Sequence, residues 1–263
     1  MSMFSYRPLL RDLTAKVLRE KWDPYEAYRY FSRVERSLGL ERHTYLSTTI
    51  TSGGHLHDPR NKKLDDVIDR NTTSAVLLAS QLADDSQIIP QMSIEPYELG
   101  YCGWKQSDYL EFWLLVIGGL EVDESTDIDV VRTRHRIEFE HAGVDFAQFN
   151  SNDDLEERAK HYFMLGAAFA KLYETEFVTK PMQRMVRLID PDTSLGAQTE
   201  RVFARCTGIP VFTVSVVMPA DPQNLFDVNR TLAEDTHQLI SFGATVFDTK
   251  QHQTRLMLVK EDG

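Results

Sequence analysis

One short stretch, residues 190–200, brings together the residue types best suited to chemistry: two aspartates, a serine, a glycine and a glutamate. The segment before it, Met-Val-Arg-Leu-Ile at residues 185–189, predicts a strand, and residues 197–207 are predicted to form a helix. In a parallel sheet, ligands bind where the carboxyl end of a strand leads into the N-terminus of the next helix. This stretch is therefore the first candidate site.

Ser194 and Gly196 fall at the predicted start of that helix. The first backbone N–H groups of a helix and the positive end of its dipole favour an anion there, and glycine lets the anion come close. Glu200 lies in the first turns of the same helix, within reach of a ligand whose phosphate the turn holds. The same residues also suit an ordinary strand–helix turn, in which a Ser or Thr caps the helix and Glu200 only complements the dipole.

A second segment begins at Tyr45 in a run of β-branched residues that predicts a strand over residues 44–50. The run is followed by Ser52, Gly53 and Gly54, which predict a flexible loop. Taken alone, the glycine pair indicates a tight turn that needs positive φ.

Together the two segments resemble the nucleoside 2-deoxyribosyltransferase superfamily, and most closely its nucleoside 5′-monophosphate N-glycosidase branch. In that branch the first strand carries a tyrosine and ends in a Ser-Ile-Arg-Gly-Gly type loop, and a late strand leads to a Ser-Leu-Gly-x-x-x-Glu turn. Here Tyr45 and the Gly53-Gly54 pair match the first pattern, and Ser194-Leu-Gly with Glu200 matches the second. The resemblance covers residues 45–90 and 183–217.

This resemblance implies an enzyme, an N-glycosyl hydrolase or a 2-deoxyribosyltransferase, that acts on a nucleotide or nucleoside without a cofactor or metal. It implies Glu200 as the nucleophile, Tyr45 as the residue that orients Glu200 or the sugar, and Asp190 as an assisting group. The expected substrate-binding residues are Ser52, Gly53, Gly54, Asp192, Ser194 and Gly196.

The expected chemistry explains why two carboxylates are useful. Cleavage of an N-glycosidic bond builds positive charge on the sugar, and a carboxylate below the anomeric carbon can trap it as a covalent ester. An acid near the base helps it leave, and Asp190 or Asp192 could take that role or order the sugar hydroxyls. Asp190 suits a turn residue before Pro191 equally well.

Three functions stay open at this point. The first is cleavage, or transfer, at the base–sugar bond of a nucleoside 5′-monophosphate or related nucleotide. Thr51 or Ser52 stands where the nucleotide branch commonly has an arginine, so a nucleoside substrate is an alternative. The second is an NAD-type dinucleotide glycohydrolase, and the third is a non-catalytic nucleotide-sensing module that keeps Glu200 for binding.

These residues need a scaffold, and the pattern predicts an α/β domain around a mainly parallel, flavodoxin-like sheet flanked by helices. Residues 1–40 are expected to be an amphipathic helical N-terminal arm, with Asp23 as N-cap and Pro24 in the first turn. Residues 41–217 are expected to form the main domain, with a large helical insertion over about 95–180. Residues 218–263 are expected to be a C-terminal helix around 224–241 and a polar tail.

The composition of the chain argues against some classes of binding partner. Forty acidic and 29 basic residues give a formal charge of −11, which disfavours nucleic-acid binding. The longest apolar run, residues 112–117, is too short to cross a membrane, and the two cysteines fit a reduced cytoplasm. Because helical arms often complete sites across a two-fold axis, we expect a homodimer or higher homo-oligomer.

Several other residues have two interpretations each. His55 and His57 indicate a polar loop rather than a metal site, and His135 and His141 are expected to face solvent. The aromatic residues that could stack on a base are expected instead to be buried core: Trp104, Phe112 and Trp113. Glu95 and Glu98 follow the short predicted strand 88–90 and are further candidates for substrate contact.

Overall fold

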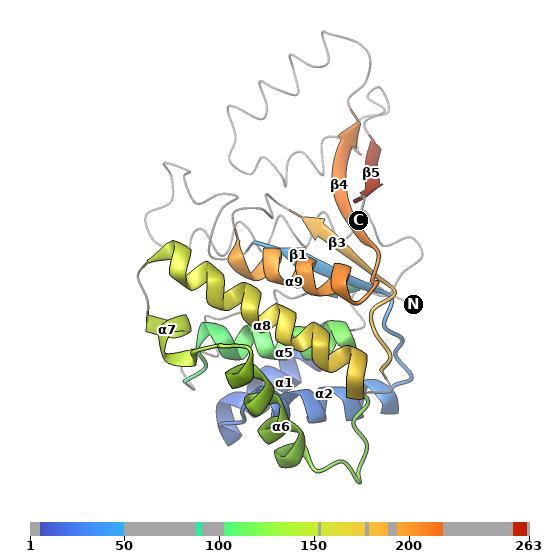
Figure 1. Ribbon diagram of the computed structural model, residues 1–263. Coiled ribbons are helices and arrows are strands. Elements are labelled where there is room, and N and C mark those ends of the chain that lie inside the picture. The colour runs from blue at the N-terminus through green and yellow to red at the C-terminus, as the bar shows by residue number, and fades with distance from the viewer. Residues whose placement is uncertain are drawn as a thin grey trace, which may run out of the picture.

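The computed structural model describes residues 6–49, 88–90, 103–151, 154–176, 179–188, 194–217 and 255–261 (Figure 1). The predicted helices over 64–82 and 224–241 lie outside these ranges, as do the histidine pair His55 and His57 and the glutamates Glu95 and Glu98.

The centre of the fold is a five-stranded sheet with the order β2-β1-β3-β4-β5. Strands β1 to β4 pair in parallel, and β5 pairs antiparallel with β4. The strands are β1 (Thr44–Thr48), β2 (Ile88–Pro90), β3 (Arg184–Leu188), β4 (Val211–Val217) and β5 (Arg255–Lys260). This sheet and the helices beside it confirm the predicted α/β fold with parallel strands.

Helices α8 and α9 pack against each other, and α9 contacts β1, β3 and β4 of the sheet (Figure 1). The described helices are α1 (Tyr6–Glu20), α2 (Pro24–Ser37), α5 (Gln106–Gly118), α6 (Ile128–His141), α7 (Phe146–Ser151), α8 (Leu155–Glu176) and α9 (Leu195–Cys206). The segment predicted as a helical insertion therefore contains α5 to α8. None of the helices in the described ranges combines the length and the apolarity that a membrane crossing requires.

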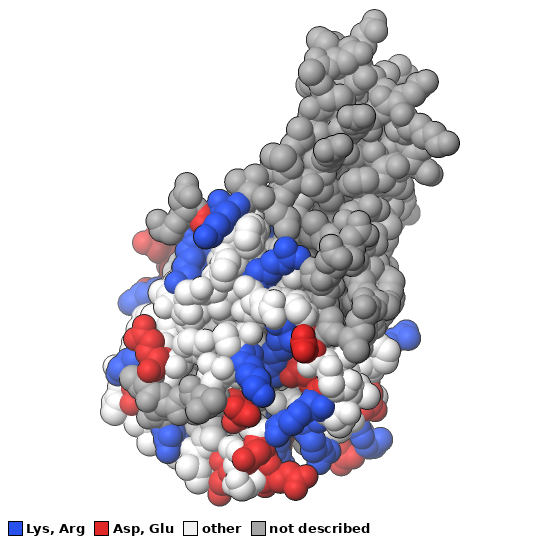
Figure 2. Space-filling model, turned by 90° about the vertical axis from the view of Figure 1, so that its right-hand side faces the viewer, with Lys and Arg blue, Asp and Glu red and all other residues white. Residues whose placement is uncertain are grey.

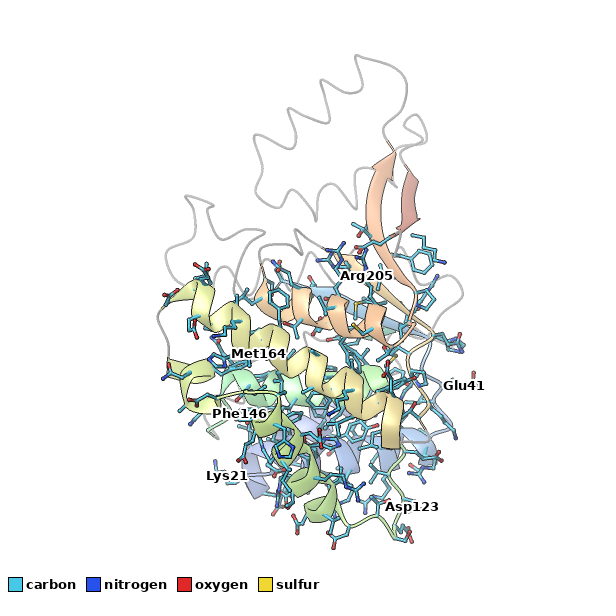
Figure 3. The ribbon with its side chains drawn as sticks, viewed as in Figure 1. Lys21, Glu41, Asp123, Phe146, Met164 and Arg205 are labelled. Atoms are coloured by element: carbon cyan, nitrogen blue, oxygen red, sulfur yellow. The ribbon has the colours of Figure 1, made fainter. Side chains whose placement is uncertain are left out.

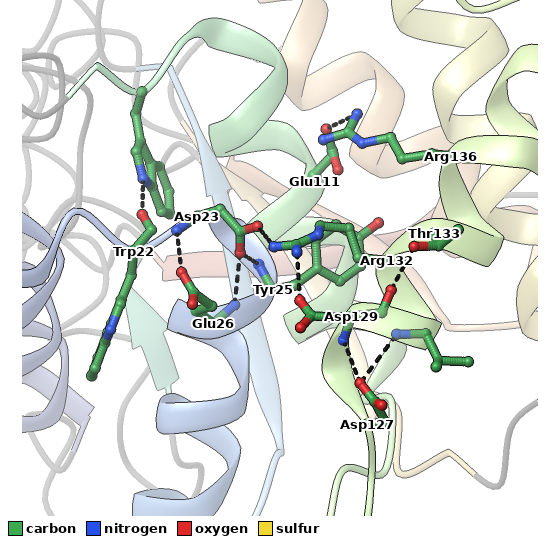
Figure 4. Close-up of polar contacts among 12 residues, drawn as sticks. Trp22, Asp23, Tyr25, Glu26, Glu111, Asp127, Asp129, Arg132, Thr133 and Arg136 are labelled. Carbon is green, nitrogen blue, oxygen red and sulfur yellow. Dashed lines mark hydrogen bonds and ion pairs between the residues drawn. The ribbon is translucent and has the colours of Figure 1, made fainter.

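The N-terminal arm starts its second helix as the sequence predicts. Asp23 accepts hydrogen bonds from the backbone N–H groups of Tyr25 and Glu26, and Glu26 accepts one in return from the Asp23 N–H, a complete capping box (Figure 4). Arg132 from α6 also binds the Asp23 carboxylate. The cap therefore fixes both the start of α2 and its position beside α6.

The arm packs on the main domain and shares its hydrophobic core. Phe31 of α2 stacks edge-on against Phe112 of α5 with ring centroids 6.0 Å apart. Trp104 donates its indole N–H to the Trp22 carbonyl at 2.8 Å, and Tyr28 donates to the Leu120 carbonyl at 2.5 Å. These contacts place the arm on the main domain.

One prediction about these elements is wrong, and one strand was not predicted. His135 is only 1% exposed, because α6 turns that side chain inward against Tyr25, whose hydroxyl lies 3.0 Å from His135 Nδ1. The expected polar tail instead contains β5, which pairs with β4. His141 is exposed, with 71% of its side chain accessible, and Trp104, Phe112 and Trp113 are core residues as expected.

Candidate active site

Strand β1 presents two hydroxyl groups to one face of the sheet. Side chains alternate along a strand, so Tyr45 and Ser47, two residues apart, point the same way. Both side chains are fully buried. The Tyr45 ring also packs on Trp113 of α5 at 5.7 Å between centroids, which fixes the position of its hydroxyl.

Helix α9 brings Glu200 to the same face. Ser194 is its N-cap, and the Ser194 Oγ accepts a hydrogen bond from the Ala197 N–H at 3.4 Å. Glu200 lies in the second turn and is 1% exposed. The helix start therefore coincides with the turn that the sequence assigns to an anion, and its next turn carries the glutamate.

The two strand hydroxyls bind the two oxygens of this carboxylate. Tyr45 Oη donates to Glu200 Oε1 at 2.8 Å, and Ser47 Oγ donates to Oε2 at 2.6 Å. Hydrogen bonds to a carboxylate stabilise its charged form and hold it in one orientation. A carboxylate held in this way is oriented to act as a nucleophile.

Close packing behind α9 keeps Glu200 in register with β1. Gly166 of α8 lies against Thr199, and a Cβ at Gly166 would be 2.7 Å from Thr199 Cγ2. Thr199 is fully buried and donates its hydroxyl to the Leu195 carbonyl at 2.9 Å. Because α8 approaches α9 at a glycine, the helix sits deep enough for Glu200 to reach both hydroxyls.

The site lies where the chain changes direction across the sheet. From β1 the chain adds β2 on one side, and later it adds β3 and β4 on the other. Helix α9 follows β3 and returns over β1, so Tyr45, Ser47 and Glu200 all lie at this crossover. In open parallel sheets, ligands bind at such a switch point, beyond the carboxyl ends of the strands.

The first residues of α9 are not buried in the core. Leu195 and Gly196 are partly exposed, and their N–H groups belong to the first turn, where no intrahelical acceptor exists. The nearest atom to a Cβ built on Gly196 would be Ser194 Oγ at 3.8 Å. The turn therefore has the geometry that close approach of an anion requires.

Comparison of the chain with protein-family models, with curated proteins and with solved structures finds no match. The assignment of this site therefore depends on the residues and their geometry. Within the described ranges, His, Cys, Asp and Glu side chains do not gather in groups of three that could hold a metal ion.

The structure brings together part of the predicted site. Tyr45 and Glu200 are in direct contact, and Ser194 and Gly196 lie six and four residues before Glu200 on the same helix start. Their roles in catalysis and binding stay predictions. The other expected site residues lie outside the described ranges: Ser52, Gly53, Gly54, Asp190 and Asp192.

Sequence reasoning missed one member of the site, Ser47. It lies in the same β-branched run as Tyr45, and it binds the second oxygen of Glu200. The period of two along a strand is the signal that finds it, because a residue two places from Tyr45 must share its face.

Proposed function

We propose that this chain cleaves the base–sugar bond of a nucleoside 5′-monophosphate or related nucleotide, with Glu200 as the nucleophile. The observation that carries the proposal is the Glu200 carboxylate held by Tyr45 and Ser47 at the crossover of a parallel sheet. The strand order 2-1-3-4-5 supports a flavodoxin-like arrangement, with the difference that β5 runs antiparallel.

The reaction we propose has two steps. A Glu200 oxygen attacks the anomeric carbon while the bond from that carbon to the base nitrogen breaks, and the base leaves with the electron pair and takes up a proton. Water, or a second base in a transfer reaction, then attacks the anomeric carbon while the bond from that carbon to the Glu200 oxygen breaks, and the attacking group gives its proton to the Asp190 carboxylate. Tyr45 and Ser47 act as positioning residues, and Asp190 is the proposed proton donor.

The phosphate of the substrate would bind at the first turn of α9. Ser194 caps this helix, and the N–H groups of the partly exposed residues Leu195 and Gly196 can donate to an anion. Ser52, Gly53, Gly54 and Asp192 are proposed as further substrate contacts from the family resemblance. This arrangement favours a nucleotide over a nucleoside, because a nucleoside leaves the helix start without its anion.

Incubation with a panel of nucleotides, followed by chromatography for free base, tests the proposal. Release of base from nucleoside monophosphates that is lost in Glu200→Gln supports it. Nicotinamide released from NAD would instead select the dinucleotide glycohydrolase. Equal turnover of nucleosides and nucleotides would move the function to the deoxyribosyltransferase type.

One observation favours the alternative of a nucleotide-binding module without turnover. Glu200 is 1% exposed, so the described conformation closes its carboxylate to solvent. Nucleotide binding by calorimetry with no base released over long incubation would select this alternative.

We also propose a cytoplasmic homodimer or higher oligomer. The oligomeric part is tested by small-angle scattering, in which a monomer that retains full activity at the measured concentration would contradict it. These assignments follow from the sequence and from the family that it resembles.

A further inference from the structure

A second group of charged residues lies on the same face of the sheet and includes none of the predicted site residues. Arg187 of β3 and Arg201 and Arg205 of α9 converge on one carboxylate, that of Glu261, directly after β5. We call the three basic residues the three-arginine cluster. Arg205 lies towards the end of α9, below β4 and β5 in the view of Figure 3.

The three arginines and Thr213 together surround the carboxylate with four donors. Oε1 of Glu261 accepts from Arg187 Nη1 at 3.0 Å and from Thr213 Oγ1 at 2.6 Å. Oε2 accepts from Arg201 Nε at 2.5 Å and from Arg205 Nη2 at 2.9 Å. A carboxylate must therefore share each oxygen between two donors, whereas a phosphate group offers additional oxygens to the same four donors.

The environment is suited to anion capture. The Glu261 side chain is 10% exposed and that of Arg187 only 2%, so their attraction acts in a poorly hydrated space. Burial opposes ionisation of Glu261, but the hydrogen bonds from Thr213, Arg187 and Arg201 lower its pKa to about 2. Glu261 is therefore an anion at neutral pH.

The cluster can also be reached from solvent. The side chains of Arg201 and Arg205 are 32% and 35% exposed. On the face drawn in Figure 2, the described surface mixes basic and acidic side chains. An incoming anion could meet the two exposed arginines before it displaces Glu261.

The three-arginine cluster lies beside the candidate active site. Arg187 pairs in register with Ser47, the residue that binds Glu200, and Arg201 follows Glu200 on α9. Neighbouring strands lie about 4.8 Å apart, so the cluster is adjacent to the candidate active site on the same face.

We propose that the three-arginine cluster is a binding site for a phosphate group, which Glu261 fills within the same chain until phosphate displaces it. The proposal concerns anion binding and does not depend on turnover at Glu200. Glu261 is thus an internal competitor, and its removal should expose the site.

Calorimetric titration with inorganic phosphate at constant ionic strength tests the proposal. Glu261→Gln removes the competing charge while it keeps the shape of the side chain, and it should bind phosphate at least tenfold more tightly than the wild type. The matched control is Glu121→Gln, which removes one negative charge from a pair with Lys180 elsewhere on the surface. Arg201→Gln added to Glu261→Gln should abolish the gain.

Three results would overturn the proposal. These are equal phosphate affinities in Glu261→Gln and Glu121→Gln, a gain that survives Arg201→Gln, or acetate binding to Glu261→Gln as tightly as phosphate. If Glu261→Gln does not fold, hydrogen exchange of residues 255–261 in the wild type replaces it. Exchange there should be faster in phosphate than in chloride of equal ionic strength, and unchanged exchange would refute displacement.

Discussion

Tyr45 and Glu200 are separated by 155 residues in the sequence, and Tyr45 Oη donates a 2.8 Å hydrogen bond to Glu200 Oε1 in the folded chain. Both side chains are buried, and Ser47 binds the other carboxylate oxygen at 2.6 Å. The contact joins the first parallel strand to the helix that follows β3. It therefore orients one carboxylate at the crossover of the sheet, where a bound ligand is expected.

Replacement of Glu200 by Gln should abolish turnover and leave the fold intact. The amide keeps the size of the side chain but cannot form the covalent ester, and loss of a nucleophile lowers kcat by several orders of magnitude. Single-turnover release of base measures the effect, with Glu174→Gln on the exposed face of α8 as the matched control. A Glu200→Gln variant that keeps more than about a tenth of the wild-type rate would exclude the nucleophile role.

Tyr45→Phe should shift the pH dependence of the reaction. The ring stays packed on Trp113, but the carboxylate loses a hydrogen-bond donor that favours its charged form. The acidic limb of the kcat/KM profile should then move to higher pH. Ser47→Ala should act in the same direction, and Ser47→Thr, which keeps a hydroxyl, should restore the profile. A lower rate with no movement of the acidic limb would indicate a purely structural contact.

The sequence alone predicted the local features of this fold well. Asp23 caps α2 and Ser194 caps α9, because a short polar side chain directly before a helix can accept hydrogen bonds from its first backbone N–H groups. Gly208 has a φ of +74° after α9, a conformation that glycine adopts easily. Such features depend only on a few neighbouring residues, and a single sequence contains them in full.

Features that depend on distant partners were missed. His135 is surrounded by charged neighbours in the sequence, yet α6 turns it towards Tyr25, a residue 110 positions away. Strand β5 was missed because the contacts that hold it involve residues far away in the sequence. It pairs with β4, and the Glu261 that follows it is bound by arginines of β3 and α9. The Tyr45–Glu200 contact joins residues 155 positions apart, and in the sequence only the family resemblance relates the two.

Two glycine substitutions should have opposite effects on stability. Gly166→Ala would place a Cβ 2.7 Å from Thr199 Cγ2 and push α8 away from α9, with a net loss of roughly 1–2 kcal/mol. Gly196→Ala meets only Ser194 Oγ at 3.8 Å and should be neutral or stabilising by up to about 1 kcal/mol. Thermal unfolding of both variants measures the difference. Equal stabilisation of the two would show that α8 can move without strain.

Stability should depend on a buried carboxyl of α5 that is not a member of the candidate site. Glu111 of α5 is fully buried beside Arg136, whose Nη1 lies 2.9 Å from Oε1 (Figure 4). Burial raises the pKa of Glu111 from 4.5 to about 8, against the smaller opposite effect of Arg136. The folded chain thus holds this proton more tightly than the unfolded chain. Its contribution to stability is complete below pH 4.5 and is lost as the pH rises towards 8.

The wild type should therefore lose on the order of 3 kcal/mol of unfolding free energy between pH 5 and pH 8 through this group. Glu111→Gln, which does not titrate, should not show this loss. Urea unfolding at several pH values measures the slope, and Glu174→Gln serves again as the control. His135 acts in the other direction, because burial lowers its pKa from 6.5 to about 4, so its contribution is lost as the pH falls through that range. Parallel pH dependence in Glu111→Gln and the wild type would contradict the assignment.

Removal of the phosphate from the substrate tests the role of the α9 start. If the N–H groups of Leu195 and Gly196 bind the phosphate, each charge-assisted hydrogen bond contributes about 1.5–3 kcal/mol. A nucleoside should then lose at least about 2 kcal/mol in kcat/KM relative to its monophosphate, roughly thirtyfold. Gly196→Val should produce the same loss by blocking close approach, and it should do so only for phosphorylated substrates. Because the nearest atom to a Cβ at Gly196 is 3.8 Å away, this variant should fold normally. Equal efficiency on a nucleoside and its monophosphate would reject a phosphate site at this helix and leave Glu200 to act on a nucleoside.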